Sequence, residues 1–281
     1  MSEALVIGLK FLRRIYAIFF GRSKNRKQER IEVADEASSF IVYDALMSDQ
    51  ACMIAGFRST EFNCLVNYRA VKDNTRSYLK YIKGKIPSWW WDKSITKNLC
   101  LFGTFFPKEE SKIEQFCELL EHDMVEVDVL FSRLSYEGLF HKELANSKKI
   151  NFELLNPYFT KIRWTQALKG KKVLIIHPLA VIIQQQYLKR NLLLKNYLLP
   201  SFELKILQPS LSIAENTVLF KDWFAVLENL KSEIDRHDYE ICLIGDCGAY
   251  GFPLAAHVKR SGKKSIELGG NLQLLFGIRD K

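Results

Sequence analysis

The sequence lacks the short motifs that identify several large enzyme classes. It has no Walker motif, no G-x-S-x-G turn and no H-E-x-x-H helix, the hallmarks of P-loop nucleotidases, α/β-hydrolases and zinc proteases. Its six cysteines include no C-x-x-C pair, and no cysteine and histidine cluster has the spacing of a zinc site. Most of these cysteines stand in apolar contexts typical of buried thiols. We therefore expect a reducing, cytoplasmic location.

Long apolar runs, internal repeats and low-complexity segments are also missing. Residues 5–20 are apolar, but Lys10, Arg13 and Arg14 interrupt them, so the uninterrupted runs are too short to span a bilayer. No small-residue cleavage site is evident, which argues against a secretory signal. With 281 residues, of which 48% are hydrophobic, the chain can bury a substantial core in one large domain or two small ones.

The net charge of +9 belongs mainly to the first 30 residues. That segment has eight basic and two acidic residues, a net charge of +6, so the remaining 251 residues carry only +3. The body of the chain is therefore near neutral, and the basic charge belongs to the N-terminal segment. We therefore expect no nucleic-acid partner.

The N-terminal segment has the pattern of an amphipathic helix with a basic continuation. Such a helix would lie in a membrane interface and place its basic residues against anionic headgroups. We expect residues 5–30 to contact the inner face of the plasma membrane, as in a peripheral membrane protein. The alternative is a helix docked on the core of the protein and followed by a solvated basic linker. The residues expected on the apolar side are Phe11, Leu12, Ile15 and Phe19.

Apolar periodicity divides the rest of the chain into alternating strands and helices. The expected strands are residues 51–57, 125–131, 171–176, 202–207, 240–244 and 265–268. The expected helices are residues 33–48, 61–82, 108–122, 179–190 and 217–236, with Ser59 or Thr60 as a helix cap and a further helix that has Pro253 in its first turn. Alternation from residue 171 onward predicts an α/β fold with a Rossmann-like parallel sheet. We divide the chain into the N-terminal segment 1–30 and one α/β domain, 31–281, with halves 31–168 and 169–281.

The most informative stretch is residues 241–270, where an apolar run meets a glycine-rich turn and a helix. The glycines have the spacing G-x-x-G-x-x-G, not the dinucleotide spacing G-x-G-x-x-G. Backbone N–H groups at the start of a helix suit a phosphate, so we expect a nucleotide to bind here. The alternative is that the glycines only allow close helix–strand packing. The expected binding residues are Gly245, Asp246, Gly248, Ala249, Tyr250 and Gly251, with Gly269 and Gly270 after the next strand.

Three polar side chains follow other predicted strands, where ligands of parallel sheets bind. Glu61 has the position of a ligand for a divalent metal, although a charge favoured by the helix dipole explains it as well. His177 has the position of a phosphate-binding group or a base, or of a structural histidine. Glu137 is a second candidate carboxylate, or a surface charge. Of the three tryptophans at 89–91, at least one should be partly exposed, either to stack on a sugar or to contact a membrane. The alternative is that they hold their loop on the core of the protein.

These residues resemble a known family. The run ICLIGDCGAYGFPLAAHVKRSGKKSIELGG is similar to the C-terminal end of bacterial GT-D-fold glycosyltransferases, which have an apolar strand, a glycine-rich turn, a helix and a strand with a small-residue turn. Residues 51–67 resemble the N-terminal strand and R-F-G-D-G-E turn of that family. Over residues 40–278 the chain is similar to uncharacterised proteins of bacterial surface-polysaccharide clusters, in which KVLIIHP, GAYGFPLAAHVK and QLLFGI recur in order.

The resemblance implies a cytoplasmic hexosyltransferase that uses a nucleotide-diphosphate sugar and a lipid-linked or growing glycan. It also implies a divalent metal, Mn²⁺ or Mg²⁺, at the D-x-E motif. Glu61 matches the glutamate of that motif, but Ser59 stands at the aspartate position, which weakens the expected metal site. Gly56 stands at the arginine position, and Arg58 at the position of the glycine.

Two other functions fit parts of the pattern. The degenerate D-x-E motif also fits a non-catalytic assembly protein of the same pathway that keeps a nucleotide-sugar pocket without turnover. A nucleotide-dependent oxidoreductase is a third possibility, but the glycine spacing is wrong for it. In that case Glu267 would be the rough candidate for the acid that binds a ribose.

Overall fold

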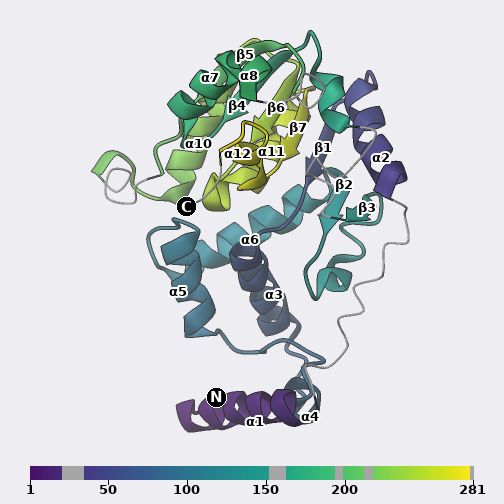
Figure 1. The fold of residues 1–281 in the computed structure, drawn as a ribbon. Coiled ribbons are helices and arrows are strands. Elements are labelled where there is room, and N and C mark those ends of the chain that lie inside the picture. The colour runs from purple at the N-terminus through teal and green to yellow at the C-terminus, as the bar shows by residue number, and fades with distance from the viewer. Residues whose placement is uncertain (21–34, 152–162, 194–198, 212–217, 279–281) are drawn as a thin grey trace.

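The computed structural model describes residues 1–20, 35–151, 163–193, 199–211 and 218–278. Within them, seven parallel strands form one sheet in the order β3-β2-β1-β7-β6-β4-β5 (Figure 1). The predicted parallel α/β fold is therefore confirmed. The strands are β1 (Cys52–Ala55), β2 (Val127–Ser132), β3 (Lys148–Asn151), β4 (Lys172–Ile176), β5 (Glu203–Leu207), β6 (Ile241–Ile244) and β7 (Lys264–Glu267).

The two halves of the chain meet in the middle of this sheet. Strands β1 to β3 come from the first half and β4 to β7 from the second, and the pairing of β1 with β7 joins them. Alternate residues of each central strand face opposite sides, as in β1, where Met53 and Cys52 belong to different apolar clusters. Both faces are therefore buried, which explains why these strands read as continuous apolar runs.

Helices cover both faces of the sheet. One face is covered by α3 (Ser59–Asp73), α6 (Glu110–Met124), α10 (Trp223–Asp235) and α11 (Gly251–Arg260). The other is covered by α2 (Asp35–Met47), the 3-10 helix η3 (Trp164–Leu168), α7 (Ala180–Leu188) and α12 (Asn271–Leu274). Trp223 and Trp164 are fully buried, one in each layer. A buried apolar side chain stabilises a fold by about 1.5–3 kcal/mol, so these layers supply most of the driving force.

Some sequence expectations differ from the structure. The helix expected over 61–82 is two helices, α3 and α4 (Tyr78–Ile82), because Asn74 adopts a left-handed conformation, with a φ of 50°, and ends α3. The residue at the N-cap of α3 is Arg58, so the predicted Ser59 or Thr60 cap is wrong. Sequence reasoning also missed β3 and α5 (Lys93–Phe102). The remaining short elements are η1 (Glu137–Phe140), α8 (Arg190–Leu193) and η4 (Gly248–Tyr250).

The N-terminal helix α1 (Glu3–Phe19) lies beside α4, at the end of the molecule away from β5 (Figure 1). Leu9 packs with Tyr81 and Trp89 in a small separate apolar cluster. Trp89 is buried, whereas Trp90 and Trp91 are partly exposed, which confirms that these tryptophans are not all buried. The basic linker at 21–30 lies outside the described residues. Within the described residues, no helix combines the length and apolar content needed to cross a bilayer.

Candidate functional site

The predicted site residues follow neighbouring strands of the sheet. In a parallel sheet all carboxyl ends lie at one edge, where ligands bind. The strands concerned are β2, β1, β7, β6 and β4, which are adjacent in that order. The structure therefore brings candidates from both halves of the chain to one edge. The residues that follow these strands are, in the same order, Glu137, Glu61, the pair Gly269 and Gly270, the loop 245–251, and His177.

At this edge the chain leaves neighbouring strands toward opposite faces. After β6 it enters η4 and α11, which lie on the face covered by α3 and α6. After β4 and β7 it enters α7 and α12 on the other face. Diverging connections leave a crevice beyond the strand ends, the usual ligand site of open α/β sheets.

A charged cluster lies in this region. Both terminal nitrogens of Arg58 donate to Asp246 Oδ1 at 3.2 Å, which links the turn after β1 to the loop after β6. Glu61 and Glu267 are buried, with 7% and 6% of their surface exposed. Burial lowers the pKa of Arg58, but Glu61, Glu267 and Asp246 outweigh it and raise that pKa above its ordinary value. Arg58 is therefore a fixed positive charge shared by three carboxylates.

Glu267 has an unusual protonation equilibrium. Burial raises its pKa to about 7, Glu61 adds to the effect, and Arg58 and Arg133 oppose it. Near neutral pH this carboxyl group is thus present in both forms, as suits a group that accepts and donates a proton during a reaction. Sequence reasoning considered Glu267 only as a ribose-binding acid. Its position at the end of an apolar strand was the available signal.

Glu61 has a free acceptor at the same edge. Its Oε2 atom is buried without a hydrogen-bond partner among the described residues. Burial raises the pKa of this carboxyl group, while its own backbone N–H and Arg58 lower it. Glu61 and Glu267 thus form a pair of acids, one from each half of the chain.

The glycine loop is closely packed. A Cβ atom at Gly245 would lie 2.6 Å from Leu272 and 2.7 Å from the His177 ring. One at Gly251 would lie 3.2 Å from Glu267 Oε1. Gly248 has a left-handed φ of 55° and lies against the backbone of Gly103. The packing interpretation of these glycines is thus supported, whereas a phosphate at the loop stays a prediction.

Two other loop residues contribute to the fold. The N–H of Ala249 donates to the carbonyl of Gly103 at 3.3 Å, and the N–H of Tyr250 donates to Cys247 at 3.2 Å. The Tyr250 ring is fully buried and stacks on Trp223 with 4.9 Å between centroids. Asp246 is exposed, Gly269 partly exposed and Gly270 exposed, so these three remain accessible to a ligand.

His177 is a buried neutral imidazole. Its Nδ1 accepts the N–H of Leu179 at 3.0 Å, and burial lowers the pKa of the ring, against a smaller opposing effect of Asp246. The proton therefore resides on Nε2, which has no partner among the described residues. Nδ1 therefore stabilises the turn after β4, and the Nε2–H group is available to donate a hydrogen bond to a ligand.

Glu137 holds the turn after β2. Its carboxylate accepts the Ser132 hydroxyl and the backbone N–H groups of Arg133 and Leu134, the latter two at 3.1 and 2.8 Å. The side chain is 5% exposed, so the surface-charge interpretation is wrong. With its acceptors engaged, Glu137 has a structural role in this geometry.

The space enclosed at the strand ends is small. A hollow of about 10 Å³ lies among Arg58, Glu61, Gly248 and Glu267, enough for one water-sized group. No three carboxylate, histidine or cysteine side chains gather there or elsewhere in the described residues as metal ligands would.

No family model, curated protein or solved structure matches this chain.

Proposed function

We propose that the protein is a glycosyltransferase that moves a sugar from a nucleotide-diphosphate donor to a lipid-linked or growing glycan. The observation that carries this proposal is the buried pair Glu61 and Glu267 beside Arg58 and Arg133 at the carboxyl edge of a parallel sheet. Transfer to a hydroxyl group needs a base for the acceptor and positive charge for the leaving diphosphate. This cluster supplies both.

In the proposed reaction, the acceptor oxygen attacks the anomeric carbon and the bond from that carbon to the diphosphate oxygen breaks. Glu267, whose pKa burial raises to about 7, takes the hydroxyl proton in its ionised form. The leaving diphosphate keeps the electron pair, and Arg58 and Arg133 stabilise its charge. Burial lowers the pKa of Arg133, against the opposing effect of Glu267, and Arg58 lowers it further. The negative charge of a bound diphosphate would offset the unfavourable burial of this guanidinium beside a second one.

The residues present do not fit the divalent metal that the family resemblance implies. Glu61 has a free, buried oxygen, but Arg58 already places a positive charge beside both acids, and Ser59 is exposed at the aspartate position. Hard cations need several oxygen ligands. In the proposed reaction the arginines, rather than a metal, therefore stabilise the diphosphate charge.

A transfer assay tests this proposal. Purified protein would be given UDP-, GDP- and dTDP-sugars with a polyprenyl diphosphate-linked sugar, whose sugar hydroxyl is the acceptor, with and without Mn²⁺. We expect transfer from one donor without added metal, and Glu267→Gln should lower the rate by roughly 10²-fold while the donor still raises the melting temperature. Full activity of Glu267→Gln would contradict the assigned role, and dependence on Mn²⁺ would return Glu61 to the role of metal ligand.

The degenerate D-x-E motif, with Ser59 at the aspartate position, favours a second candidate, a non-catalytic assembly protein that binds a nucleotide sugar. In either case the hollow of about 10 Å³ must open before a donor enters. A melting temperature raised by one nucleotide sugar, with no transfer or hydrolysis across all acceptors, would support this alternative. Detectable transfer would eliminate it.

The exposed face of α1 supports peripheral membrane association. The side of α1 that faces the protein carries Leu9, Lys10 and Arg13, whereas the other side presents large apolar side chains to solvent. An interfacial helix buries such a face in lipid. Phe11→Ser with Ile18→Ser should abolish sedimentation with anionic vesicles. The control is Val218→Ser with Leu219→Ser, an equally exposed pair elsewhere, which should change nothing. The apolar side chains exposed on α1 include Ile7, Phe11, Ile18 and Phe19, at 63%, 62%, 78% and 76%.

A further inference from the structure

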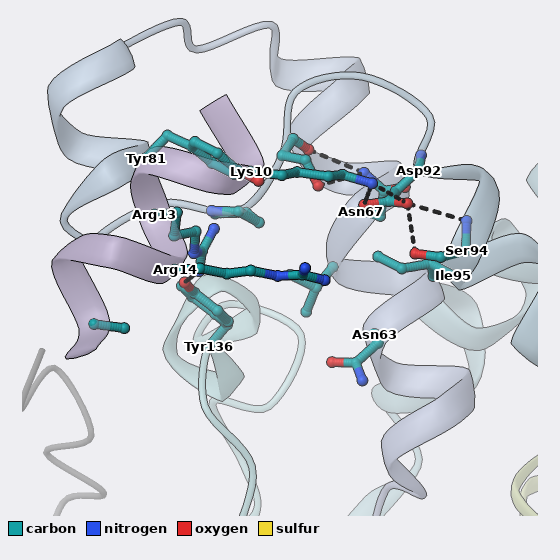
Figure 2. A pocket seen from close by; sticks show the side chains of 14 residues that line it. Lys10, Arg13, Arg14, Asn63, Asn67, Tyr81, Asp92, Ser94, Ile95 and Tyr136 are labelled. Carbon is teal, nitrogen blue, oxygen red and sulfur yellow. Dashed lines mark hydrogen bonds and ion pairs between the residues drawn. The ribbon is translucent and has the colours of Figure 1, made fainter. Parts of the chain in front are cut away.

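A second cavity, larger than the hollow at the strand ends, lies between α1, α3 and the start of α5. Its volume is about 420 Å³, within the range of small-molecule sites. Figure 2 shows the basic side chains of α1 on one side of this cavity and Asn63, Asn67 and Ser94 on the other. We call it the α1 cavity.

The α1 cavity carries an excess of positive charge. Lys10 is neutralised by Asp92, whose carboxylate lies 2.7 Å from its Nζ. Within the part of the chain that the structure describes, Arg13 contacts neutral groups, donating to Ile86 O at 3.4 Å and to the Tyr136 hydroxyl at 3.3 Å. Arg14 has no hydrogen-bond or ion-pair partner among the described residues, and its side chain extends across the cavity (Figure 2). Two guanidinium charges thus remain for an anion.

The helix that supplies these arginines also carries the exposed apolar face. On a helix, side chains three, four and seven residues apart are neighbours, so Arg14 borders the row formed by Ile7, Phe11 and Ile18. Arg13 lies on the docked side, where its guanidinium is 4.6 Å from the Tyr81 ring centroid. If the apolar row lies in lipid, Arg14 stands at the level of the headgroups, at the entrance of the cavity.

The α1 cavity shares a helix with the charged cluster at the sheet edge. Asn63 and Asn67 line it from α3, the helix that begins at Ser59 and carries Glu61. At about 1.5 Å of rise per residue, these two residues lie about 3 and 9 Å along the helix from Glu61. Tyr136, at the other wall, directly precedes Glu137 after β2. Asn63 and Asn67 follow Glu61 by two and six positions, so on the helix their side chains point away from Glu61, and the cavity and the charged cluster lie on different sides of α3.

We infer that the α1 cavity binds the phosphate or diphosphate headgroup of a membrane-embedded lipid that carries the acceptor. Arg14 and Arg13 bind the phosphate oxygens, and Asn63 offers a hydrogen bond to the group beyond them. The apolar face of α1 holds the protein on the bilayer that contains the lipid chain. This inference rests on the proposed function and adds the class of acceptor and the place where it binds.

Binding to vesicles tests the inference without any transfer reaction. The full-length protein would be titrated with phosphatidylcholine vesicles that contain a polyprenyl monophosphate, and with vesicles of equal charge made with phosphatidylglycerol. We expect at least about fivefold tighter binding to the polyprenyl phosphate vesicles, because only a phosphate monoester on a slender lipid presents its oxygens to both arginines. Equal affinity for the two vesicles would overturn the inference.

Matched variants locate the site. Arg14→Ala should weaken binding to polyprenyl phosphate vesicles by about tenfold, as expected for one charge-assisted contact, and Arg236→Ala, which removes the same charge from the exposed end of α10, should not. Asn63→Asp, which places a negative charge in the cavity without a change of size, should weaken binding similarly. Equal losses for Arg14→Ala and Arg236→Ala would refute a local site.

Two further arms separate the other outcomes. Inorganic diphosphate, measured by calorimetry, should bind much more weakly than the lipid, and equal affinity would show that the site takes a free anion. Glu267→Gln should retain vesicle binding while it loses transfer. If the parent protein binds the lipid but transfers no sugar, the lipid site is supported and the proposed transferase activity is contradicted. If it transfers sugar to soluble acceptors and shows no preference for the lipid, the transferase is supported and the lipid site is contradicted.

Discussion

Glu267 should make the protein less stable as the pH rises, and its removal should reverse that effect. Its pKa is about 7 in the folded protein, against an ordinary value of 4.5. Between these values the folded state keeps a proton that the unfolded state has released, so the free energy of unfolding falls as the pH rises. The difference of about 2.5 units corresponds to about 3 kcal/mol above pH 7.

Glu267→Gln has nearly the same shape and cannot ionise. Compared with the parent protein, its free energy of unfolding should gain roughly 2–3 kcal/mol between pH 5 and pH 8. Urea titrations at both pH values, followed by tryptophan fluorescence, measure this gain, because Trp164 and Trp223 are fully buried and become exposed on unfolding. Glu228→Gln, an exposed change on α10, is the control and should show no gain. A parallel pH dependence in the parent and Glu267→Gln would refute the reasoning.

Two further predictions concern packing and capping. Gly245→Ala places a methyl group 2.6 Å from Leu272 and should cost about 1–3 kcal/mol of unfolding free energy, whereas Gly270→Ala, with no atom within 4 Å, should be nearly neutral; urea midpoints of the two variants decide this. Asp222 caps α10 through the N–H of Ala225 at 2.9 Å and pairs with Lys112 at 2.8 Å, so Asp222→Ala should cost about 1–2 kcal/mol. Asp222→Asn, which keeps the cap but loses the ion pair, should recover about half of that loss in the melting temperature, and full loss in both would show that the cap contributes nothing.

Sequence alone predicted most of the sheet because its central strands are apolar on both faces. Strands β4 and β6 appear as short apolar runs bounded by polar or glycine residues, and their ends differ from the prediction by one residue. Strand β3 has only Ile150 fully buried and lies at the sheet edge, so no apolar run marks it. For α5 the sequence did contain a helix-start signal, the capping residue Asp92, whose side chain accepts the N–H of Ser94 at 3.0 Å.

The sequence predicted where the site lies, beyond the ends of neighbouring strands, but not how its residues interact. The rule that ligands bind beyond parallel strands selected Glu61, His177 and the loop after β6. The protonation of Glu267 depends on its neighbours in space, and Arg58 lies more than two hundred positions away in the chain, so no local pattern indicates it. The function of the glycines was ambiguous for the same reason, since Leu272 and Gly103 come to the loop only in the folded protein.

The pairing of β1 with β7 has a consequence for how the protein is made. Met53 lies opposite Ser265, so one edge of β1 has no partner until the ribosome has synthesised more than two hundred further residues and released β7. An unpaired apolar strand edge is prone to pair with other chains, and contacts of such long range form slowly. During synthesis, β1 and the turn after it, which carries Arg58 and Glu61, cannot reach their final positions until β7 has formed. A chain that terminates before residue 264 should therefore aggregate more readily than one that includes β7.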